Sequence, residues 1–516
     1  MTLRKLLPYS IACLLTALPI LSSCVDGGMA DVSLPHEEAD GSGVYVSVVV
    51  NTEGGTRTRA IGSPTPGENG DDEWPGENYE NRIDNLYLYF FDGGEDESGI
   101  RKGINADGNT QIEARVNFSF GEGNLHGYNN RYFTEPMEID ELQIGKTYDV
   151  LAIANVDGMK TDTDFSTLGK LRDAATLEAV ENNLFVMSSA NPIFDAEKRI
   201  NSVKIEGNNS KNNPATVNID VERLAARIDC RVNDSYQIGT TGDVVKIQQF
   251  IVVNKYFENT VNNNIEYSYW FKRVTAGTDL SVNPLAFTYL GDEEPKNGLS
   301  AASNYVIGPM TLNLPTIETD NHHYDNSLYF HDAEDWAQLW RGLSTEVTSK
   351  DEDGITYYLL DYTQENVIPA EVLENEDKRK YYCTGVVFKA QYTPAGFTKG
   401  ETFYWYANKF YKTLEEIATA MGGNISLTDD NCLQYGIYKY TNGICYYTYW
   451  IRHADDGDPT KISPMEYAIV RNNIYQLDVN SVSGIGGTEP GEEGGLIIRV
   501  SLASWREDIN VYPDFD

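Results

Sequence analysis

Cysteine is scarce in this sequence, with six residues among 516. None of them forms a C-x-x-C pair, and no two histidines lie at zinc-finger spacing, so the sequence predicts no zinc site. Cys432 and Cys445 could meet across a hairpin, which the spacing alone cannot decide. Buried free thiols are the expected state of the later cysteines, namely Cys230, Cys383, Cys432 and Cys445.

Basic residues are also few. The chain has 40 lysines and arginines against 78 acidic residues, which gives a net charge of −38. A field of this sign repels nucleic-acid phosphates and anionic lipid head groups, so nucleic acid is excluded as a partner. Solubility is the simplest role of the charge, which says little about the fold.

The usual catalytic motifs are missing. The sequence contains no Walker A motif, no G-x-S-x-G and no Cys/His signature, and Gly484-Ile-Gly486 lacks the third glycine of a dinucleotide loop. His322 and His323 could suggest a metal cluster, but adjacent residues of a strand point to opposite faces. The sequence therefore predicts no enzyme, no cofactor and no metal site.

Helical patterns are rare, whereas alternating β patterns recur from the first folded segment onward. Val44, Val46, Val48 and Val50 alternate with other residues, which is typical of a strand with a buried face. Gly54 and Gly55 end this strand, and a loop rich in Pro, Gly and acidic residues extends to about residue 76. Arg57 and Arg59 lie in this exposed tether, where proteolysis concentrates. We interpret 44–50 as a strand that is cut away and replaced by a strand of another copy.

Further strands are predicted throughout the chain, with few helices, at 168–184 and 412–421. The strand segments are 83–92, 112–120, 144–155, 217–232, 244–254, 267–274, 381–392, 402–408 and 469–481, with a hairpin at 433–452 turning at Asn442-Gly443. The segment 217–232 exceeds an ordinary strand and should bridge two sheets at the domain boundary. The pattern predicts an all-β chain with minor α, built from two β-sandwiches, the second carrying an irregular insertion at 275–380.

The first 24 residues have the features of a targeting segment. Arg4 and Lys5 precede an apolar run, 6–21, that is shorter than a membrane span. The run ends in Leu21-Ser-Ser-Cys24, which resembles a bacterial lipoprotein box, so Cys24 is the expected lipidated residue. An acidic, glycine-containing tether follows it. Lipid chains on Cys24 would anchor the precursor in a membrane.

The C-terminus mirrors the first strand. After a Gly-rich leader, Leu496, Ile498, Val500 and Leu502 alternate at the spacing of the four valines. A shorter alternation begins at Ile509 and Val511. We interpret 496–505 as a donor strand, with 509–515 as an alternative or additional donor. The competing interpretation is an ordinary last strand of its own domain.

Several motifs in a fixed order resemble the fimbrillins, the shaft subunits of type V pili in Bacteroidales, and most closely the minor, short-fimbria type. They are the lipoprotein box, V-S-V-V-V…T-R-A-I-G, T-Y-D-V-L-A-I-A-N, F-V-M-S-S, V-E-R-L-A-A-R-I, V-V-F-K-A and V-R-N-N-I-Y-Q-L-D-V-N-S-V-S-G-I-G. The resemblance implies two transthyretin-like β-sandwiches. It also implies that an Arg-specific, trypsin-like protease cuts after Arg59, before Ala60, with Arg57 as an alternative. The cut would release the anchor and the first strand, and the C-terminal strand of a neighbour would fill the groove.

The resemblance divides the chain into four parts. They are the signal and lipidated cysteine (1–24), a propeptide with the removable strand (25–59), the N-terminal sandwich (60–222) and the C-terminal sandwich with the donor strand (223–516). The implied product is an outer-membrane lipoprotein precursor that becomes an extracellular fimbrium supporting adhesion. Its partners would be identical subunits, anchor and tip proteins, the protease and, before cleavage, the outer membrane. The alternatives are a monomeric, lipid-anchored glycan- or host-binding protein and an accessory anchor or tip subunit.

Overall fold

The computed structural model describes most of the predicted strands but only parts of the chain between them. The described residues are 43–52, 72–73, 77–95, 101, 103, 106–128, 131–156, 165–176, 180–181, 184–189, 201–255, 258–259, 264–265, 268–271, 274–276, 287–288, 304–306, 340–343, 347–350, 356–366, 373–374, 379, 382–453, 462, 466–491 and 495–504. The segments predicted for targeting, lipidation and cleavage lie outside this range. So do the histidines at 322 and 323 and the tail after residue 504.

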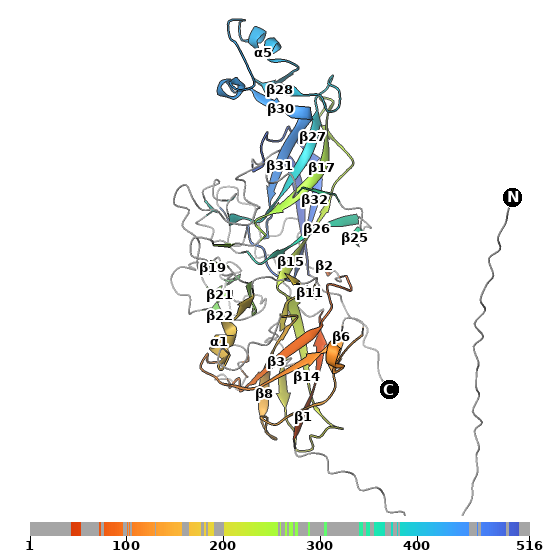
Figure 1. Ribbon diagram of the computed structural model, residues 1–516, viewed down its shortest axis with the longest axis vertical. Coiled ribbons are helices and arrows are strands. Elements are labelled where there is room, and N and C mark those ends of the chain that lie inside the picture. The colour runs from red at the N-terminus through yellow and green to blue at the C-terminus, as the bar shows by residue number, and fades with distance from the viewer. Residues whose placement is uncertain are drawn as a thin grey trace, which may run out of the picture. The chain divides into compact units, whose positions relative to one another are not determined.

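The first half of the chain forms a β-sandwich, seen around β1 and β8 in Figure 1. One layer contains β5 (Leu125–Tyr128), β6 (Arg131–Thr134), β1 (Val44–Asn51), β7 (Met137–Ile139) and β14 (Ala215–Arg223). The other contains β4 (Ile112–Ser119), β3 (Asn85–Phe91), β8 (Thr147–Ala154), β12 (Met187–Ser189) and β13 (Ser202–Lys204). The helix α1 (Leu168–Arg172) follows β8 and is capped by the Thr167 side chain. The helix predicted at 168–184 is therefore wrong beyond residue 172, because short strand segments lie at 175–176, 180–181 and 184–185.

Strand β14 belongs to both layers. Its residues up to Asp220 pair with β1, and those from Val221 to Arg223 pair with β12. Alternate side chains along it, including Val217 and Ile219, are fully buried. Strand β3 is buried over almost its whole length because it pairs with β4 and β8 in the interior of its layer. One hydrophobic core fills the space between the two layers.

The second half forms another sandwich. One layer contains β2 (Asp72–Glu73), β33 (Leu496–Ser504), β32 (Asn473–Val482), β15 (Ala225–Arg231), β26 (Thr356–Gln364) and β25 (Val347–Lys350). The other contains β16 (Tyr236–Ile238), β17 (Asp243–Val253), β27 (Gly385–Thr393), β31 (Ile444–Trp450) and β24 (Arg341–Gly342). The chain passes between the sandwiches at Leu224, where the run 217–232 changes from β14 to β15.

A small sheet lies between β27 and β31 in sequence. It contains β28 (Phe403–Tyr406), β29 (Lys409–Tyr411) and β30 (Tyr438–Tyr440), with the helix α5 (Leu414–Ala420) and the short 3-10 helices η7 (Cys432–Tyr435) and η8 (Thr441–Gly443). The helix predicted at 412–421 is confirmed, and Thr413 and Glu416 form its capping box. The hairpin predicted at 433–452 is wrong. Strand β30 pairs with β28 whereas β31 pairs with β27, because the left-handed residues Asn442 and Gly443 redirect the chain into a different sheet.

The remaining described pieces are short. They are η2 (Phe120–Glu122), β9 (Ala175–Thr176), β10 (Val180–Glu181), β11 (Leu184–Phe185), β18 (Glu258–Asn259), β19 (Asn264–Ile265), β20 (Ser268–Tyr269), β21 (Val274–Ala276), β22 (Phe287–Thr288) and β23 (Asn304–Val306). The insertion expected at 275–380 ends earlier than predicted. Its later part supplies β25 and β26, and β26 pairs with β15 in the main layer because its aromatic and β-branched side chains suit a sheet.

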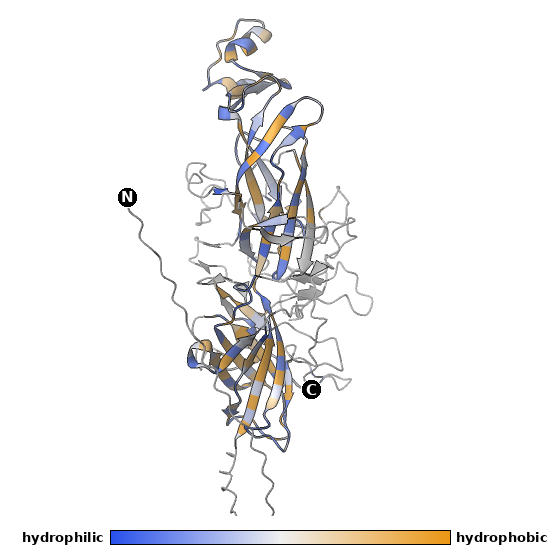
Figure 2. Ribbon diagram, turned by 90° about the vertical axis from the view of Figure 1, so that its right-hand side faces the viewer, coloured by the Kyte–Doolittle hydropathy of each residue, from blue (hydrophilic) through white to orange (hydrophobic). Residues whose placement is uncertain are grey.

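The all-β prediction with two sandwiches is confirmed. Figure 2 shows hydrophobic and hydrophilic residues alternating along the strands, as layers with one buried face require. Cys230, Cys383, Cys432 and Cys445 are buried free thiols, as expected. Burial raises the pKa of the Cys445 thiol to about 12, so it is an unreactive core residue. Within the described part, no helix has both the length and the apolar character needed to cross a membrane.

Buried tyrosines should make the fold sensitive to alkali. Burial raises the pKa of Tyr89 to about 12, above the value near 10 of an unfolded chain. Its contribution to stability is therefore complete below pH 10 and is lost as the pH rises toward 12. In this window each such tyrosine should lower the free energy of unfolding by about 1.4 kcal/mol per pH unit.

The variant Tyr89→Phe should show a shallower loss of stability between pH 10 and 12, measured by urea unfolding at each pH. Wild type and variant should run parallel between pH 7 and 9, which serves as the internal control. Parallel curves above pH 10 as well would contradict the assignment.

Candidate functional site

The first described strand, β1, occupies an interior position in its sheet. Strand β1 runs parallel to β14, with Val46 opposite Ala215 and Asn51 opposite Asp220. On its other side it is antiparallel to β6 and β7. The predicted strand is confirmed, and its four alternating valines are between 0% and 4% exposed. Strand β1 is therefore an interior strand of its layer, although it comes before all the other described strands in the sequence.

The outward-facing side of β1 makes polar contacts with its neighbours. The Tyr45 hydroxyl donates to Glu138 Oε2 at 3.1 Å. Ser47 Oγ lies 3.0 Å from Thr216 Oγ1. Asn51 Nδ2 donates to Asp220 Oδ1 at 2.8 Å. These contacts depend on the β1 side chains, so they would differ for any other strand in the same place.

Removal of β1 would open the layer on two sides. Among the described strands, β7 pairs only with β1, and the β5–β6 hairpin reaches the rest of the layer only through β1. The edges of β14, β6 and β7 would then present unpaired main-chain groups beside an apolar trough, which is a template for another strand. An occupant that reproduces the β1 ladder would run parallel to β14 and antiparallel to β6 and β7.

The proposed cleavage residues lie in the tether beyond β1. Arg57, Arg59 and Ala60 lie outside the described residues, as does Cys24. The description resumes at β2 and then at Glu77. Cleavage and lipidation at these positions stay predictions.

The predicted donor strand is present as β33. It pairs with β32 along its length, and β2 pairs with its end at Ala503 and Ser504. Val500 is buried, whereas Leu496 and Ile498 are partly buried against the second core. In the single chain this segment therefore occupies its own domain, and donation stays a prediction. The side chain of Leu502, and all of Ile509 and Val511, lie outside the described residues.

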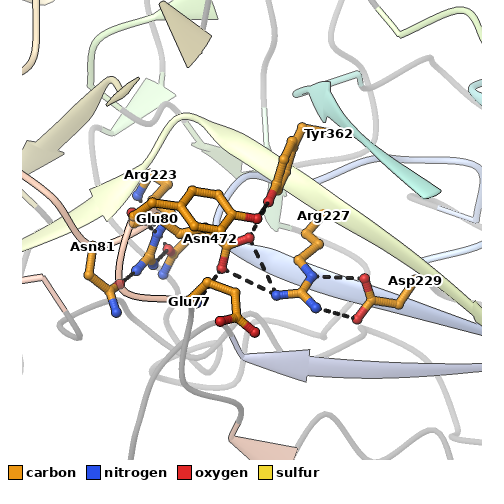
Figure 3. A network of polar contacts seen from close by, with 9 residues as sticks. Glu77, Glu80, Asn81, Arg223, Arg227, Asp229, Tyr362 and Asn472 are labelled. Carbon is orange, nitrogen blue, oxygen red and sulfur yellow. Dashed lines mark hydrogen bonds and ion pairs between the residues drawn. The ribbon is translucent and has the colours of Figure 1, made fainter. Parts of the chain in front are cut away.

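A buried polar network holds the segment that follows the tether, as Figure 3 shows. Glu80 Oε2 lies 3.2 Å from Arg227 Nη1, and both side chains are at most 1% exposed. Arg227 also donates two hydrogen bonds to Asp229, at 2.8 and 2.9 Å. Because Arg227 and Asp229 are two residues apart on β15, the strand places them on one face.

Two tyrosines extend this network. The Tyr362 hydroxyl donates to Glu80 Oε1, and the hydroxyls of Tyr79 and Tyr362 lie 2.8 Å apart. Burial, followed by the negative charge of Glu80, raises the pKa of Tyr362 well above its ordinary value. Burial alone would lower the pKa of Arg227, but Asp229 and Glu80 outweigh it and raise the pKa. Arg227 therefore stays charged and Tyr362 stays a hydrogen-bond donor.

A second arginine fixes the same segment from β14. Arg223 donates to the Asn81 side chain, to the Glu80 main-chain oxygen at 3.1 Å and to Asn472 Oδ1 at 3.0 Å. Residues 80 and 81 are thus tied to both β14 and β15. A cut farther upstream would leave this attachment intact.

The valines of β1 could be identified from the sequence, but the strands that flank them on one side, β6 and β7, could not. Strands β6 and β7 were not predicted, although Tyr132 and Thr134 alternate, as do Met137 and Ile139. Pro136 interrupts the pattern between them, and a proline within such a run argues against a strand. The polar residues Thr134, Glu138 and Asn209 carry no pattern that would single them out.

Two family models match the chain. The model described as major fimbrial subunit protein type IV, fimbrillin, C-terminal, matches residues 438–506. The model described as fimbrillin-A associated anchor proteins Mfa1 and Mfa2 matches residues 70–327, half of the chain. No curated protein matches the sequence.

Solved structures with similarity to the chain include the following three. A protein from Parabacteroides distasonis with a proposed role in cell adhesion has 15% identity, a TM-score of 0.40 and coverage of 91% of this chain and 99% of that one. The tip fimbrial protein Mfa3 from Porphyromonas gingivalis has 11% identity, a TM-score of 0.34 and coverage of 90% and 99%. A fimbrilin from Porphyromonas gingivalis has 11% identity, a TM-score of 0.35 and coverage of 90% and 98%.

Proposed function

Because this chain belongs to the fimbrillin family of the Bacteroidales and is a fimbrial structural and adhesion subunit, we propose that it forms the fimbrial shaft by strand exchange. It is made as an outer-membrane lipoprotein anchored through Cys24. An Arg-specific, trypsin-like protease cuts after Arg59 and thereby frees β1 with its anchor. The C-terminal strand of an identical subunit then fills the groove. Anchor and tip proteins would complete the fimbrium.

The position of β1 carries this proposal. It is the first of the described strands, yet it lies between β14 on one side and β6 and β7 on the other. Its loss would expose the seat of four buried valines, and refilling it with residues of similar size would recover on the order of 6–12 kcal/mol before ordering costs, at about 1.5–3 kcal/mol per side chain. That gain must offset the ordering of an incoming tail. The replacement is therefore favourable only for a strand with a matching apolar face.

The chain carries such a face at its other end. Leu496, Ile498, Val500 and Leu502 repeat the two-residue spacing of the β1 valines. A joint between the C-terminal strand of one copy and the groove of the next is head-to-tail, so it can continue without closing. This supports a filament of identical subunits.

The proposal is tested by treating the purified precursor with an Arg-specific protease. Electron microscopy should show filaments only after treatment, and unheated SDS gels should show a ladder that collapses on heating. N-terminal sequencing of the polymer should begin at Ala60. A polymer that still contains residues 44–51 would refute the exchange.

A second candidate is an anchor subunit, favoured by the match to anchor proteins over residues 70–327. An anchor has no need to lose its lipid or β1. The same sequencing experiment separates the two roles, because an anchor isolated with fimbriae would retain residues 25–59.

A further inference from the structure

On each side of β1 the pairing with a flanking strand has a gap. Strand β14 does not reach Tyr45, which pairs with β7 on its other side, and neither β6 nor β7 pairs with Val48, which pairs with β14 on its other side. The register of β14 with β1 begins at Val46, so Tyr45 lies beyond the end of that ladder. On the other side, β7 pairs with 44–46 and β6 with 49–51, which leaves Val48 opposite the break between them. Pro136 lies in this break and has no N–H to donate. Both gaps are filled by side chains.

Asn209 fills the first gap. The Tyr45 N–H donates to Asn209 Oδ1 at 2.7 Å, and Asn209 Nδ2 donates to the Tyr45 main-chain oxygen at 2.8 Å. A carboxamide presents the same donor and acceptor as a peptide group, so Asn209 continues the β14 ladder by one residue. The turn that contains Asn209 is closed by a main-chain hydrogen bond from Asn209 N to Glu206 O, at 3.1 Å.

Thr134 fills the second gap. Its Oγ1 accepts the Val48 N–H at 3.0 Å, and the side chain is buried. An unbonded N–H at this depth would be unfavourable, because water cannot replace the lost partner. These hydrogen bonds from Thr134 and Asn209 are made to main-chain atoms of β1. Those of Glu138, Thr216 and Asp220 are made to β1 side chains.

We propose that Asn209 and Thr134 form a main-chain clamp that holds whichever strand occupies the groove, an inference that rests on the proposed strand exchange. The clamp requires an N–H at the places of Tyr45 and Val48. If Leu496 takes the place of Val44, Ile497 takes the place of Tyr45 and Val500 takes the place of Val48. Both residues have a main-chain N–H. The clamp therefore accepts 496–505 in the register that also matches the valines.

The same clamp disfavours the alternative donor. If Ile509 takes the place of Val44, Pro513 takes the place of Val48, and proline has no main-chain N–H. Thr134 would then have no main-chain donor to accept from. The clamp thus acts as a specificity determinant that selects 496–505 over 509–515 in the matched register.

The test uses the whole chain cut after Arg59 and fluorescent peptides of residues 496–505 and 509–515, with binding measured by anisotropy. Asn209→Ala and Thr134→Val should each weaken the 496–505 peptide about tenfold. Asn208→Ala is the matched control and should bind as the wild type does. Thr134→Val should leave the affinity for the 509–515 peptide unchanged. Thermal melts of each variant report its folding separately.

Methylated peptides separate a clamp from a merely structural role. N-methylation at Val500 should weaken binding to the wild type about tenfold and have no further effect on Thr134→Val. N-methylation at Ile497 should behave in the same way with Asn209→Ala. Equal methylation penalties in wild type and variants would overturn the clamp while leaving strand exchange intact. If the cut chain bound neither peptide, both the exchange and the clamp would be overturned.

Discussion

Replacing both Arg57 and Arg59 by alanine should abolish filament formation and leave a folded monomer. A trypsin-like protease needs a basic residue before the scissile bond, and these are the two arginines in the tether after β1. Without the cut, β1 remains covalently attached and competes with any incoming strand at a very high effective concentration. Electron microscopy and unheated SDS gels after protease treatment would measure the loss.

Arg82→Ala is the matched control for this variant. Arg82 is an exposed arginine paired with Asp84, and it lies beyond the tether. Its replacement should leave both cleavage at Ala60 and filament assembly unchanged. Filaments of normal length from the double variant would show that the cut at these arginines is not the trigger.

Replacing Arg227 by methionine should destabilise the protein by about 3–5 kcal/mol, because it leaves buried carboxylates without their cation. Glu80 and Asp229 both contact Arg227, and all three side chains are at most 1% exposed. Chemical unfolding at neutral pH would measure the change. The effect should include the attachment of residues 77–82, which would become more accessible to proteases.

Arg231→Met provides the comparison. Arg231 binds Asp478 with two hydrogen bonds, at 2.8 and 2.7 Å, but the arginine is partly exposed. Exposed and partly exposed pairs contribute about 1 kcal/mol or less. A loss at Arg227 no larger than that at Arg231 would mean that the buried network contributes little to stability.

Much of the fold could be predicted from alternation alone. β3, β8, β14 and β15 have continuous or alternating apolar patterns, and the structure places each as a strand of a sandwich. The hairpin predicted at 433–452 is wrong because a turn-forming dipeptide does not determine which strands pair. Asn442-Gly443 has the composition of a hairpin turn, but the strands on either side pair with β28 and β27 instead.

The site was only half predictable. The apolar face of β1 could be predicted because burial leaves a two-residue period in the sequence. The partners of its backbone could not, because Asn209 and Thr134 bind through geometry and not through a repeating pattern. Arg223 and Arg227 lie within a predicted strand. Their partners Asn81 and Glu80 lie far away in the sequence, and no sequence pattern connects them to the arginines.

The mixed pairing around β1 has a consequence for a fibre built by the proposed strand exchange. Under the proposed exchange, a donor that reproduces the β1 ladder lies parallel to β14 and antiparallel to β6 and β7, so every joint would have the same direction. A fibre assembled through such joints is polar, with an empty acceptor at one extremity and an unused tail at the other. The two ends of such a fibre would therefore be chemically different, and a molecule that binds only one of them would stop growth at that end alone.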